Sequence, residues 1–252
     1  HEMLNFLEQG TNEYLEIKSI ISSDKDKLPS LVKALCHLGN QPGIVFLNFK
    51  DSIQRVSDYL QDQGVPHGCF YGDMEQQDRE LALIKFRNGT HQLLLATDLA
   101  ARGIDVPEIK FIIHYHLPIK LEEFTHRNGR TARMKSEGKA FVLHWDQERL
   151  PDYFKGISPL GFEEEVLAEA PLPKNSLWQT IRISAGRKDK ISKGDIAGWL
   201  MKQGGLTKEQ VGVIELKPDQ AFVSIQIAAI DSFLDKMYEI KLKGRKVRVS
   251  VV

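Results

Sequence analysis

The sequence has few cysteines, no net charge and no long apolar run. Its two cysteines, Cys36 and Cys69, lie far apart and form no metal-type spacing, so the plain interpretation is buried, reduced thiols in a cytosolic protein. Apolar runs such as Leu93–Ala96 are far shorter than the roughly 20 residues that cross a bilayer. The first residues show no charged-then-apolar leader. We therefore expect a cytoplasmic protein that is neither secreted nor bound to a membrane.

The zero net charge hides an asymmetry along the chain. Residues 177–252 hold 14 Lys and Arg against 8 Asp and Glu, a net charge of +6, whereas residues 1–176 hold 20 against 26, a net charge of −6. Such a split predicts two units, of which the second binds an anionic partner. A lysine-rich surface that is simply solvated would give the same count, so charge alone does not decide between the two.

Short apolar runs alternate with amphipathic segments through the first part of the chain. Strands are predicted at 44–47, 68–71, 92–96, 111–114 and 140–143, and helices at 24–39, 51–63, 75–87 and 122–128. Asp24 is the expected cap of the first helix and Gly39 its expected stop. The alternation predicts an α/β fold with a mostly parallel sheet, helices on both faces, and a ligand site beyond the carboxyl ends of the strands.

The pattern changes after a segment at 168–176 that contains two prolines, Glu, Lys and Asn and is typical of a linker. Beyond it we predict strands at 178–184, 211–216, 221–227 and 246–252, and helices at 194–202 and 228–238. The order βαββαβ predicts a small α+β domain with the ferredoxin-like arrangement that RNA-recognition motif (RRM) domains use. We set the domains at 1–166 and 177–252, with a linker at 167–176.

The densest polar cluster is His-Arg-Asn-Gly-Arg-Thr-Ala-Arg at 126–133. Arg127, Arg130 and Arg133 recur at a spacing of three, which places their guanidinium groups near one face if the turn is helical. A buried face cannot hold three unpaired guanidiniums, so a polyanion or an acidic partner is expected. Arginine forks match phosphate oxygens and stabilise charge that develops on a γ-phosphate. On spacing alone, a surface network of salt bridges is the alternative.

A second cluster, Ala-Thr-Asp-Leu-Ala-Ala-Arg-Gly-Ile-Asp at 96–105, directly follows a predicted strand. Its small residues and Gly103 let the backbone approach a ligand closely. Thr97 and Arg102 are candidates for holding phosphates, and Asp105 for accepting hydrogen bonds from sugar hydroxyls. The alternative is a strand-to-helix turn that Asp98 caps.

In their order along the chain, these two clusters resemble motifs V and VI of DEAD-box RNA helicases. Upstream, 44–52 resembles motif IV, and 71–74 with 76–79 resembles the glycine-aspartate and Gln-x-x-Arg elements between motifs IV and V. The match covers about residues 12–160. It implies that the first domain is the carboxy-terminal RecA-like domain of such a helicase.

The resemblance implies a nucleotide site. Arg130 and Arg133 would reach the phosphates of ATP, with Arg133 as an arginine finger of the kind worth on the order of 10³–10⁵ in rate in other nucleotide hydrolases. Asp105 and the backbone near Gly103 would contact the ribose. A site of this kind needs a second domain to bind most of the nucleotide.

The resemblance also implies contacts to a partner domain and to RNA. His126 and Arg127 would couple this domain to the partner motor domain. The residues that would line the RNA backbone are Gly72, Asp73, Arg79, Thr97 and Arg102. Such contacts to phosphate and sugar would be independent of base sequence.

Three positions depart from the family pattern. Asn128 stands where an apolar or small residue is usual, Ala132 replaces a frequent glycine, and Phe49 replaces a common threonine of motif IV. None of the three removes a charged group, so the expected mechanism stands. The change at Phe49 weakens the expectation of an RNA contact from motif IV.

Two motifs of the family are missing: neither Gly-x-x-x-x-Gly-Lys-Ser/Thr nor Asp-Glu-Ala-Asp occurs. In the family both belong to the amino-terminal motor domain, which would supply the Mg²⁺ ligands and the phosphate-binding loop. We therefore expect a truncated, carboxy-terminal part of an ATP-dependent RNA helicase that unwinds short duplexes, unable to hydrolyse ATP alone. The alternative is a helicase-derived RNA-binding module that works without ATP turnover.

In the second domain, residues 183–190 and 193–196 resemble the RNA-binding domain of DbpA-type helicases. The resemblance implies binding to a hairpin of large-subunit ribosomal RNA and a role in ribosome assembly. The expected RNA-binding residues are Arg182, Arg187, Lys188, Lys190, Lys193, Phe222, Lys243 and Arg245. The basic loop at 187–193 either grips phosphates or only solvates the surface. Phe222 either stacks a base or fills a groove.

Two further features are expected to be structural. His114 and His116 have a metal-ligand spacing but no third ligand nearby. Trp199 lies beside Ile196 and Leu200 on a predicted helix and is expected in the core rather than on a binding platform.

Overall fold

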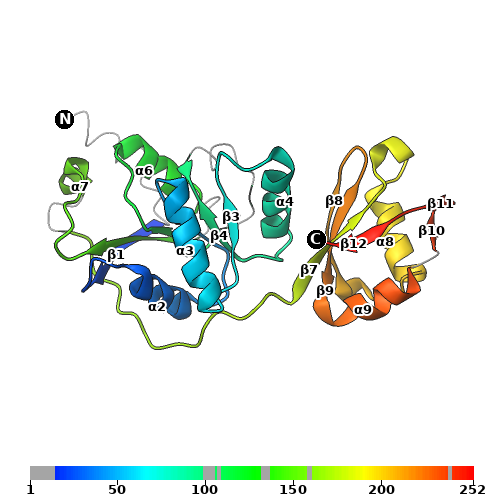
Figure 1. Cartoon of the computed structure of the whole chain (residues 1–252), viewed down its shortest axis with the longest axis horizontal. Helices are drawn as coiled ribbons and strands as arrows, with labels where there is room; N and C mark the ends of the chain where they lie inside the picture. Colours follow the sequence, from blue (N-terminus) through cyan, green and yellow to red (C-terminus); the bar gives the residue numbers. More distant parts are fainter. Residues whose placement is uncertain (1–14, 99–105, 107–108, 132–136, 158–160, 238–239) are drawn as a thin grey trace. The chain divides into compact units, whose positions relative to one another are not determined.

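Figure 1 shows the computed structural model, which describes residues 15–98, 106, 109–131, 137–157, 161–237 and 240–252. The chain divides into two compact units. One comprises residues up to Arg79 together with Gln92–Asn175, and the other comprises Glu80–His91 together with Ser176–Val252. The division passes through helix α4 (Gln76–Arg87). The domain limits given above from the sequence stay predictions.

The first unit is built on a six-stranded parallel sheet with the order β1-β6-β5-β2-β4-β3. Its strands are β1 (Leu15–Ser22), β2 (Gly43–Phe46), β3 (Gly68–Phe70), β4 (Leu93–Ala96), β5 (Phe111–His114) and β6 (Gly138–Trp145). Every residue of β2, β4 and β5 is buried, as expected for strands covered on both faces. The predicted α/β fold is confirmed, and each of the five predicted strands lies within two residues of its observed bounds.

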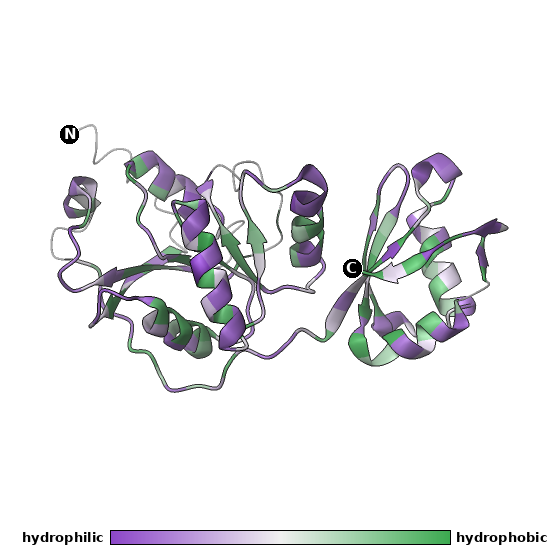
Figure 2. Ribbon diagram, in the orientation of Figure 1, coloured by the Kyte–Doolittle hydropathy of each residue, from purple (hydrophilic) through white to green (hydrophobic). Residues whose placement is uncertain are grey.

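Helices cover both faces of this sheet (Figures 1 and 2). On one face, α2 (Leu28–Leu38) and α3 (Lys50–Asp62) bury apolar residues against β2, β4, β5 and β6. On the other face, α6 (Leu121–Asn128) and α7 (Asp152–Ile157) place Phe124 and Phe154 against Val142 of β6. Hydropathy follows this arrangement, because the inner strands are hydrophobic and the helices are polar on their outer faces (Figure 2).

One strand was not predicted and one helix start was predicted wrongly, both before residue 30. The last strand, predicted at 246–252, was also wrong in its start, because the strand there is Val249–Val251. Strand β1 was not predicted, because charged Glu16 and Lys18 interrupt its apolar pattern; it is an edge strand, where charges are common. Helix α2 begins at Leu28, not near Asp24, and its N-cap Lys27 makes no side-chain cap hydrogen bond. The expected stop at Gly39 is confirmed, since Gly39 has a positive φ of 67°.

Residues 163–176, which include the linker predicted at 167–176, are bonded to the first unit at several points. Glu165 donates its backbone N–H to the carbonyl of Ser19 (2.8 Å), and its carboxylate binds Lys18 (2.8 Å) and His37 (3.1 Å). Farther along, Asn40 and Lys174 exchange two hydrogen bonds (2.8 and 3.3 Å). This segment has no regular secondary structure beyond an isolated bridge at Glu164, yet it covers the edge of β1.

In the second unit, a four-stranded antiparallel sheet has the order β12-β7-β9-β8. Its strands are β7 (Trp178–Ile183), β8 (Val211–Leu216), β9 (Ala221–Gln226) and β12 (Val249–Val251). Two helices, α8 (Lys193–Lys202) and α9 (Ile227–Lys236), bury their apolar residues against one face of the sheet. Short 3₁₀ helices η1 (Arg187–Asp189) and η2 (Lys208–Gln210) precede α8 and β8. The predicted βαββαβ order is confirmed, with an added hairpin of β10 (Lys241–Leu242) and β11 (Arg245–Lys246).

Other expectations about single residues can now be compared with the structure. Trp199 is 4% exposed and packs edge-on against Phe233, so its assignment to the core is confirmed. Cys36 and Cys69 are free thiols, but both are half-buried rather than fully buried. Among the described residues, no helix is both long and apolar enough to cross a bilayer.

Candidate functional site

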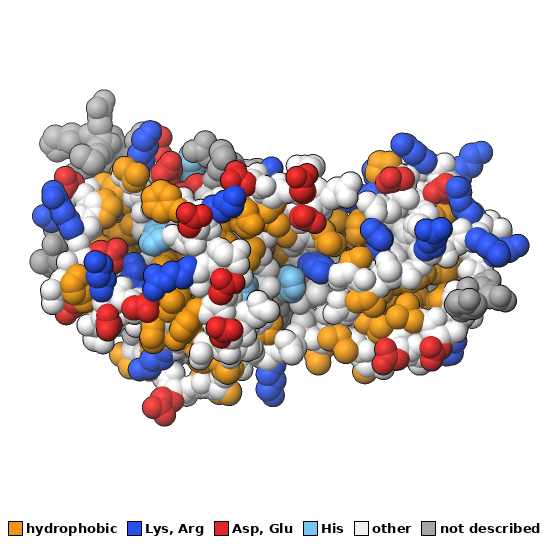
Figure 3. Space-filling model, in the orientation of Figure 1, with side chains coloured by type: hydrophobic (Ala, Val, Ile, Leu, Met, Phe, Trp, Pro, Cys, Tyr) orange, Lys and Arg blue, Asp and Glu red, His pale blue; other side chains and the backbone are white. Residues whose placement is uncertain are grey.

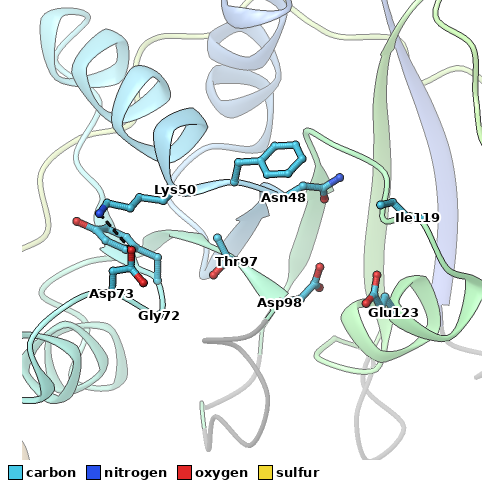
Figure 4. Close-up of a pocket in the computed structure, with 10 residues that line it drawn as sticks. Asn48, Lys50, Gly72, Asp73, Thr97, Asp98, Ile119 and Glu123 are labelled. Carbon is cyan, nitrogen blue, oxygen red and sulfur yellow. Dashed lines mark hydrogen bonds and ion pairs between the residues drawn. The ribbon is translucent and has the colours of Figure 1, made fainter.

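A pocket of about 400 Å³ opens beyond the carboxyl ends of strands β2, β3, β4 and β5 (Figure 4). Its lining residues are Asn48, Phe49, Lys50, Tyr71, Gly72, Asp73, Thr97, Asp98, Ile119 and Glu123. Figure 4 shows Lys50 and Asp73 meeting on one side, Ile119 and Glu123 on the other, and Thr97 and Asp98 between them. Parallel sheets bind ligands at this edge, so the pocket lies where the sequence predicted a site.

Arg127, on the last turn of α6, forms hydrogen bonds with the loops that follow strands β2, β4 and β5 at this edge of the sheet. Its Nε and Nη2 donate to the two carboxylate oxygens of Asp98 (2.6 and 2.5 Å), and Nη2 also donates to Asn48 Oδ1 (2.8 Å). Its Nη1 donates to the carbonyl of His116 (2.6 Å), and the guanidinium lies 5.1 Å from the ring centre of Phe46. The side chain is 1% exposed. One buried cation therefore connects the ends of β2, β4 and β5.

This geometry changes the interpretation of Arg127. The sequence suggested that three arginines share an outward face, but α6 ends at Asn128 and Arg127 points into the protein. Any coupling of Arg127 to a partner domain would therefore pass through Asp98 and Asn48. His126 is exposed at the end of the same helix, and the role predicted for it stays a prediction.

Two neutral histidines and one amide complete the buried network. His114 is fully buried, and its Nε2 donates to Asn128 Oδ1 (2.8 Å). Burial, with the nearby Arg127 charge, lowers the pKa of His114 to about 3. Burial likewise lowers the pKa of His116 to about 4, and its Nδ1 accepts a hydrogen bond from the Asn48 backbone N–H (3.3 Å). Both imidazoles are therefore neutral near pH 7, as expected for structural histidines.

The structure brings together three of the five residues that the resemblance assigns to RNA. Gly72, Asp73 and Thr97 line the pocket. Arg79 lies outside this lining, with its guanidinium 5.5 Å from the ring centre of Phe70 at the end of β3. Arg102 lies outside the described residues.

Of the residues predicted to contact nucleotide, only Arg130 is described. It follows α6 in a turn, is half-buried, and donates its backbone N–H to the carbonyl of Arg127 (3.0 Å). Gly103, Asp105 and Arg133 lie outside the described residues. Within the described ranges, no group of three or more His, Cys, Asp or Glu is arranged to hold a metal ion. The Mg²⁺ ligands expected on another domain stay a prediction.

The second unit has a basic cluster built from two loops. Gly186 packs against the β8–β9 turn, and Arg187 and Lys188 donate backbone N–H groups to the carbonyls of Lys217 (2.9 Å) and Pro218 (2.7 Å). An added Cβ at Gly186 would collide with this backbone, so only glycine allows the contact. The loop that carries the predicted basic residues is therefore held firmly to the sheet.

The β10–β11 hairpin meets this loop. Lys243 lies in the left-handed region (φ 49°), and its Nζ donates to the Lys190 carbonyl (3.1 Å) and to Asp195 (3.1 Å). Arg245 forms an ion pair with Asp189. On the face shown in Figure 3, Lys and Arg side chains gather on this unit around β10 and β11. The predicted residues of loop 187–193 and of the hairpin thus form one cluster.

Two predicted RNA-binding residues lie on β7 and β9 instead. Arg182 is exposed and is paired in register with Phe222 on the neighbouring strand. Phe222 is 6% exposed, so a base could stack on it only if its covering neighbours moved away. This burial favours the interpretation that Phe222 fills a groove over the interpretation that it stacks a base. Its role in RNA binding stays a prediction.

Comparison with known proteins finds a matching family for each part of the chain. Residues 26–135 match the helicase conserved C-terminal domain, and residues 180–251 match the DbpA RNA binding domain. The chain thus combines a helicase C-terminal domain with a DbpA RNA-binding domain. It is 29% identical to proteins named ATP-dependent RNA helicase DbpA from Bacillus subtilis, over 95% of this chain, and from Escherichia coli, over 92%.

The helicase domain also resembles solved structures. A DEAD box protein from the hyperthermophile Methanococcus jannaschii matches with a TM-score of 0.50 and 29% identity, over 58% of this chain and 43% of that one. The chain spans about half the length of the curated relatives, 55% of the Bacillus subtilis protein and 51% of the Escherichia coli protein. The RecA-like and RRM-like folds expected of the two domains are confirmed.

Sequence reasoning missed the partners of Arg127 in the helicase domain. Asp98 was considered only as a helix cap, yet both its carboxylate oxygens bind the guanidinium. Asn48 and His116 were not connected to it at all. The available signal was chemical: an arginine in an apolar setting requires an acidic partner, and Asp98 is the acid of the neighbouring motif.

Proposed function

We propose that this chain is the carboxy-terminal part of an ATP-dependent RNA helicase that unwinds short RNA duplexes. Arg127 carries this proposal, because it connects motifs IV, V and VI at the carboxyl edge of the sheet and fixes the turn that presents Arg130. Arg130, with Arg133, would stabilise charge on the phosphates of ATP bound mainly by a second motor domain. Asp105 and Gly103 would contact the ribose.

When bound, Mg²⁺ would neutralise phosphate charge, through carboxylates that we assign to the second motor domain. The helicase domain's own contribution would be cationic and positional, through Arg130 and Arg133. This division predicts that the chain alone binds nucleotide poorly and turns over none. His126, which is exposed on the last turn of α6, would face the second domain.

We further propose that the pocket holds the backbone of single-stranded RNA. Gly72 offers close backbone approach and Thr97 a hydroxyl, while Lys50 offers a charge that is now shared with Asp73 (3.2 Å). Closing of two motor domains on ATP would bend a strand held here, so that a short duplex would separate. Arg79 and Arg102 complete the expected set of RNA contacts.

The DbpA-type domain would tether the motor to a structured RNA, and we propose large-subunit ribosomal RNA during assembly in the cytoplasm. Its basic cluster combines Arg187, Lys188 and Lys193 of one loop with the β10–β11 hairpin. Tethering raises the local concentration of substrate at the motor without any new contact there.

ATP turnover tests the first proposal. The chain is joined to a motor domain with a phosphate-binding loop, and RNA-stimulated ATP hydrolysis is measured with and without Arg130→Ala. We expect a loss of at least about 10³ in turnover, the lower range for an arginine that stabilises a transferring phosphate. Arg149→Ala, which removes the same charge from an exposed loop, should change nothing. Absence of RNA-stimulated turnover in the joined protein would favour an RNA-binding module instead.

RNA binding tests the proposal that the DbpA-type domain targets a structured RNA. The full chain is titrated with a set of ribosomal RNA hairpins and with unstructured RNA over a series of salt concentrations. Lys188→Ala should weaken binding to the preferred hairpin and reduce the salt slope by about one unit. Lys202→Ala is the matched control, because it lies nine residues along α8 from Lys193, roughly 14 Å away at the rise of an α-helix. Equal binding to all RNAs would refute targeting.

A further inference from the structure

Phe49 is an exposed aromatic residue at a position where aromatics are unfavourable. It is 65% exposed, and it is the one aromatic among the large hydrophobic side chains that the described residues leave exposed. It occupies the N-cap of α3 in an extended conformation (φ −131°, ψ 145°) and makes no side-chain cap hydrogen bond. N-caps favour Ser, Thr, Asp and Asn, whose oxygen accepts from a free backbone N–H. Phe49 provides no cap hydrogen bond and exposes an apolar ring to water, and both are unfavourable for folding. Residues that break local rules of stability in this way are often functional.

The ring lies in the wall of the pocket and is supported from one side. Phe49 lines the pocket together with Lys50 and Thr97. Its ring centre is 6.3 Å from that of His116, at an interplanar angle of 58°. His116 is itself fixed by the backbone N–H of Asn48, and it is neutral near pH 7. Phe49 therefore has an uncharged support on one side and an open face towards the pocket.

The charges of the described lining do not by themselves favour a polyanion. Lys50 is the cation there, and it is bound to Asp73 (3.2 Å). Asp98 is bound to Arg127, and Glu123 adds a further acid. A nucleic acid strand in this pocket would therefore gain from attraction that does not depend on charge, beside the contacts proposed for Arg79 and Arg102. An aromatic ring provides such attraction, because every base has a π face.

We propose that Phe49 stacks on a base of the single-stranded RNA whose backbone runs past Gly72 and Thr97. This inference rests on the RNA groove proposed above and adds a contact to a base. Stacking of this kind tolerates any sequence and contributes affinity that changes little with salt, unlike contacts to phosphate. The exposed π face distinguishes the occupants, because stacking on an aromatic ring is available to every base of a nucleic acid strand.

The test uses the full chain and two single strands of about ten nucleotides, which is within the site sizes of single-strand binding domains. One is oligoadenylate, and the other has the same sugar-phosphate backbone but abasic positions. Occupancy of the pocket is read by hydrogen exchange of the peptides that contain Asn48–Lys50 and Tyr71–Asp73. These peptides report on the pocket itself, so RNA bound by the basic cluster of the other unit does not contribute.

We expect oligoadenylate to protect these peptides at lower concentration than the abasic strand. Phe49→Ala should raise the oligoadenylate concentration for half-protection by about 5- to 100-fold, the range for loss of one stacked base, and should leave the abasic strand unaffected. Phe49→Trp should retain protection, and its added fluorescence should be quenched by oligoadenylate only. Val166→Ala, which shortens an exposed apolar side chain of the first unit outside the pocket lining, should have little effect.

Three other outcomes would overturn the inference in distinguishable ways. Equal protection by both strands, unchanged by Phe49→Ala, would leave RNA in the pocket but exclude stacking. Absence of protection by either strand would overturn both the stacking and the RNA groove. Protection of the Phe49 peptide by a joined motor domain without RNA would show that the ring makes a protein contact instead.

Discussion

The buried ion pair between Arg127 and Asp98 gives the sharpest prediction from this structure. Replacing Asp98 by Asn keeps the size and shape of the side chain but removes its charge. Arg127 would remain buried with only neutral partners, namely the carbonyl of His116 and the amide oxygen of Asn48. Arginine side chains stay charged in proteins, and this one cannot reach water, because its side chain is 1% exposed.

The size of the effect follows from this burial. Removing one partner of a buried ion pair costs about 3–5 kcal/mol, but the Asp98 side chain is 25% exposed, which reduces the loss. We expect Asp98→Asn to lower the free energy of unfolding of the helicase domain by about 3 kcal/mol. For a domain of this size, that corresponds to a fall in Tm of roughly 6–12 °C.

The chain offers a matched control in Lys50 and Asp73. This pair is also hydrogen-bonded, at 3.2 Å, but its side chains are 56% and 72% exposed, so Asp73→Asn should cost less than about 0.5 kcal/mol. Thermal unfolding is followed by hydrogen exchange of peptides from β2 and α6, which separates the helicase domain from the other unit. Equal shifts for Asp98→Asn and Asp73→Asn would refute the reasoning. Adding Arg127→Met to Asp98→Asn should recover part of the loss, because the buried charge is then gone.

Three further predictions concern other parts of the chain. The pKa values of His114 and His116 are lowered to about 3 and about 4 in the folded state, so the unfolded state binds protons first. Stability should be full above about pH 6.5 and fall by roughly 2 kcal/mol for each histidine by pH 5, measured by urea unfolding at each pH. Phe49→Thr should supply the missing N-cap of α3 and stabilise the helicase domain by about 1 kcal/mol in the same assay. Gly186→Ala should push the basic loop away from the carbonyl of Lys217 and weaken hairpin RNA binding, with circular dichroism confirming that the domain still folds.

The sheet of the helicase domain could be predicted because its strands are short, apolar and covered on both faces. β5 was predicted at its observed bounds, since Phe111–His114 is an apolar run closed by polar residues. β1 escaped prediction because an edge strand needs no such run; Glu16 and Lys18 make ion pairs along the edge. The start of α2 also escaped, because Asp24 and Asp26 use their carboxylates in the turn before the helix.

The location of the candidate site at one edge of the sheet was predicted more accurately than the side-chain contacts within it. Motif residues far apart in sequence were expected at one edge of the sheet, and Gly72 and Thr97 do line one pocket there. Contacts across the sheet carry no local pattern. The Nζ of Lys27 links the end of β5 to β6 by donating to the carbonyls of Tyr115 (2.7 Å) and Leu143 (3.2 Å). No local pattern predicts this, because a lysine is usually expected on the surface.

Asn128 shows how a departure from a family pattern can be explained by one distant residue. Asn128 is 6% exposed and His114 is fully buried. Burying either polar side chain without a hydrogen-bond partner would cost free energy of folding. Together they satisfy each other in one hydrogen bond of 2.8 Å between α6 and β5. Because Arg127 directly precedes Asn128, this bond also fixes the helix end from which Arg127 reaches Asp98. The two departures from an apolar core are therefore one structural feature, which supports the turn leading to Arg130.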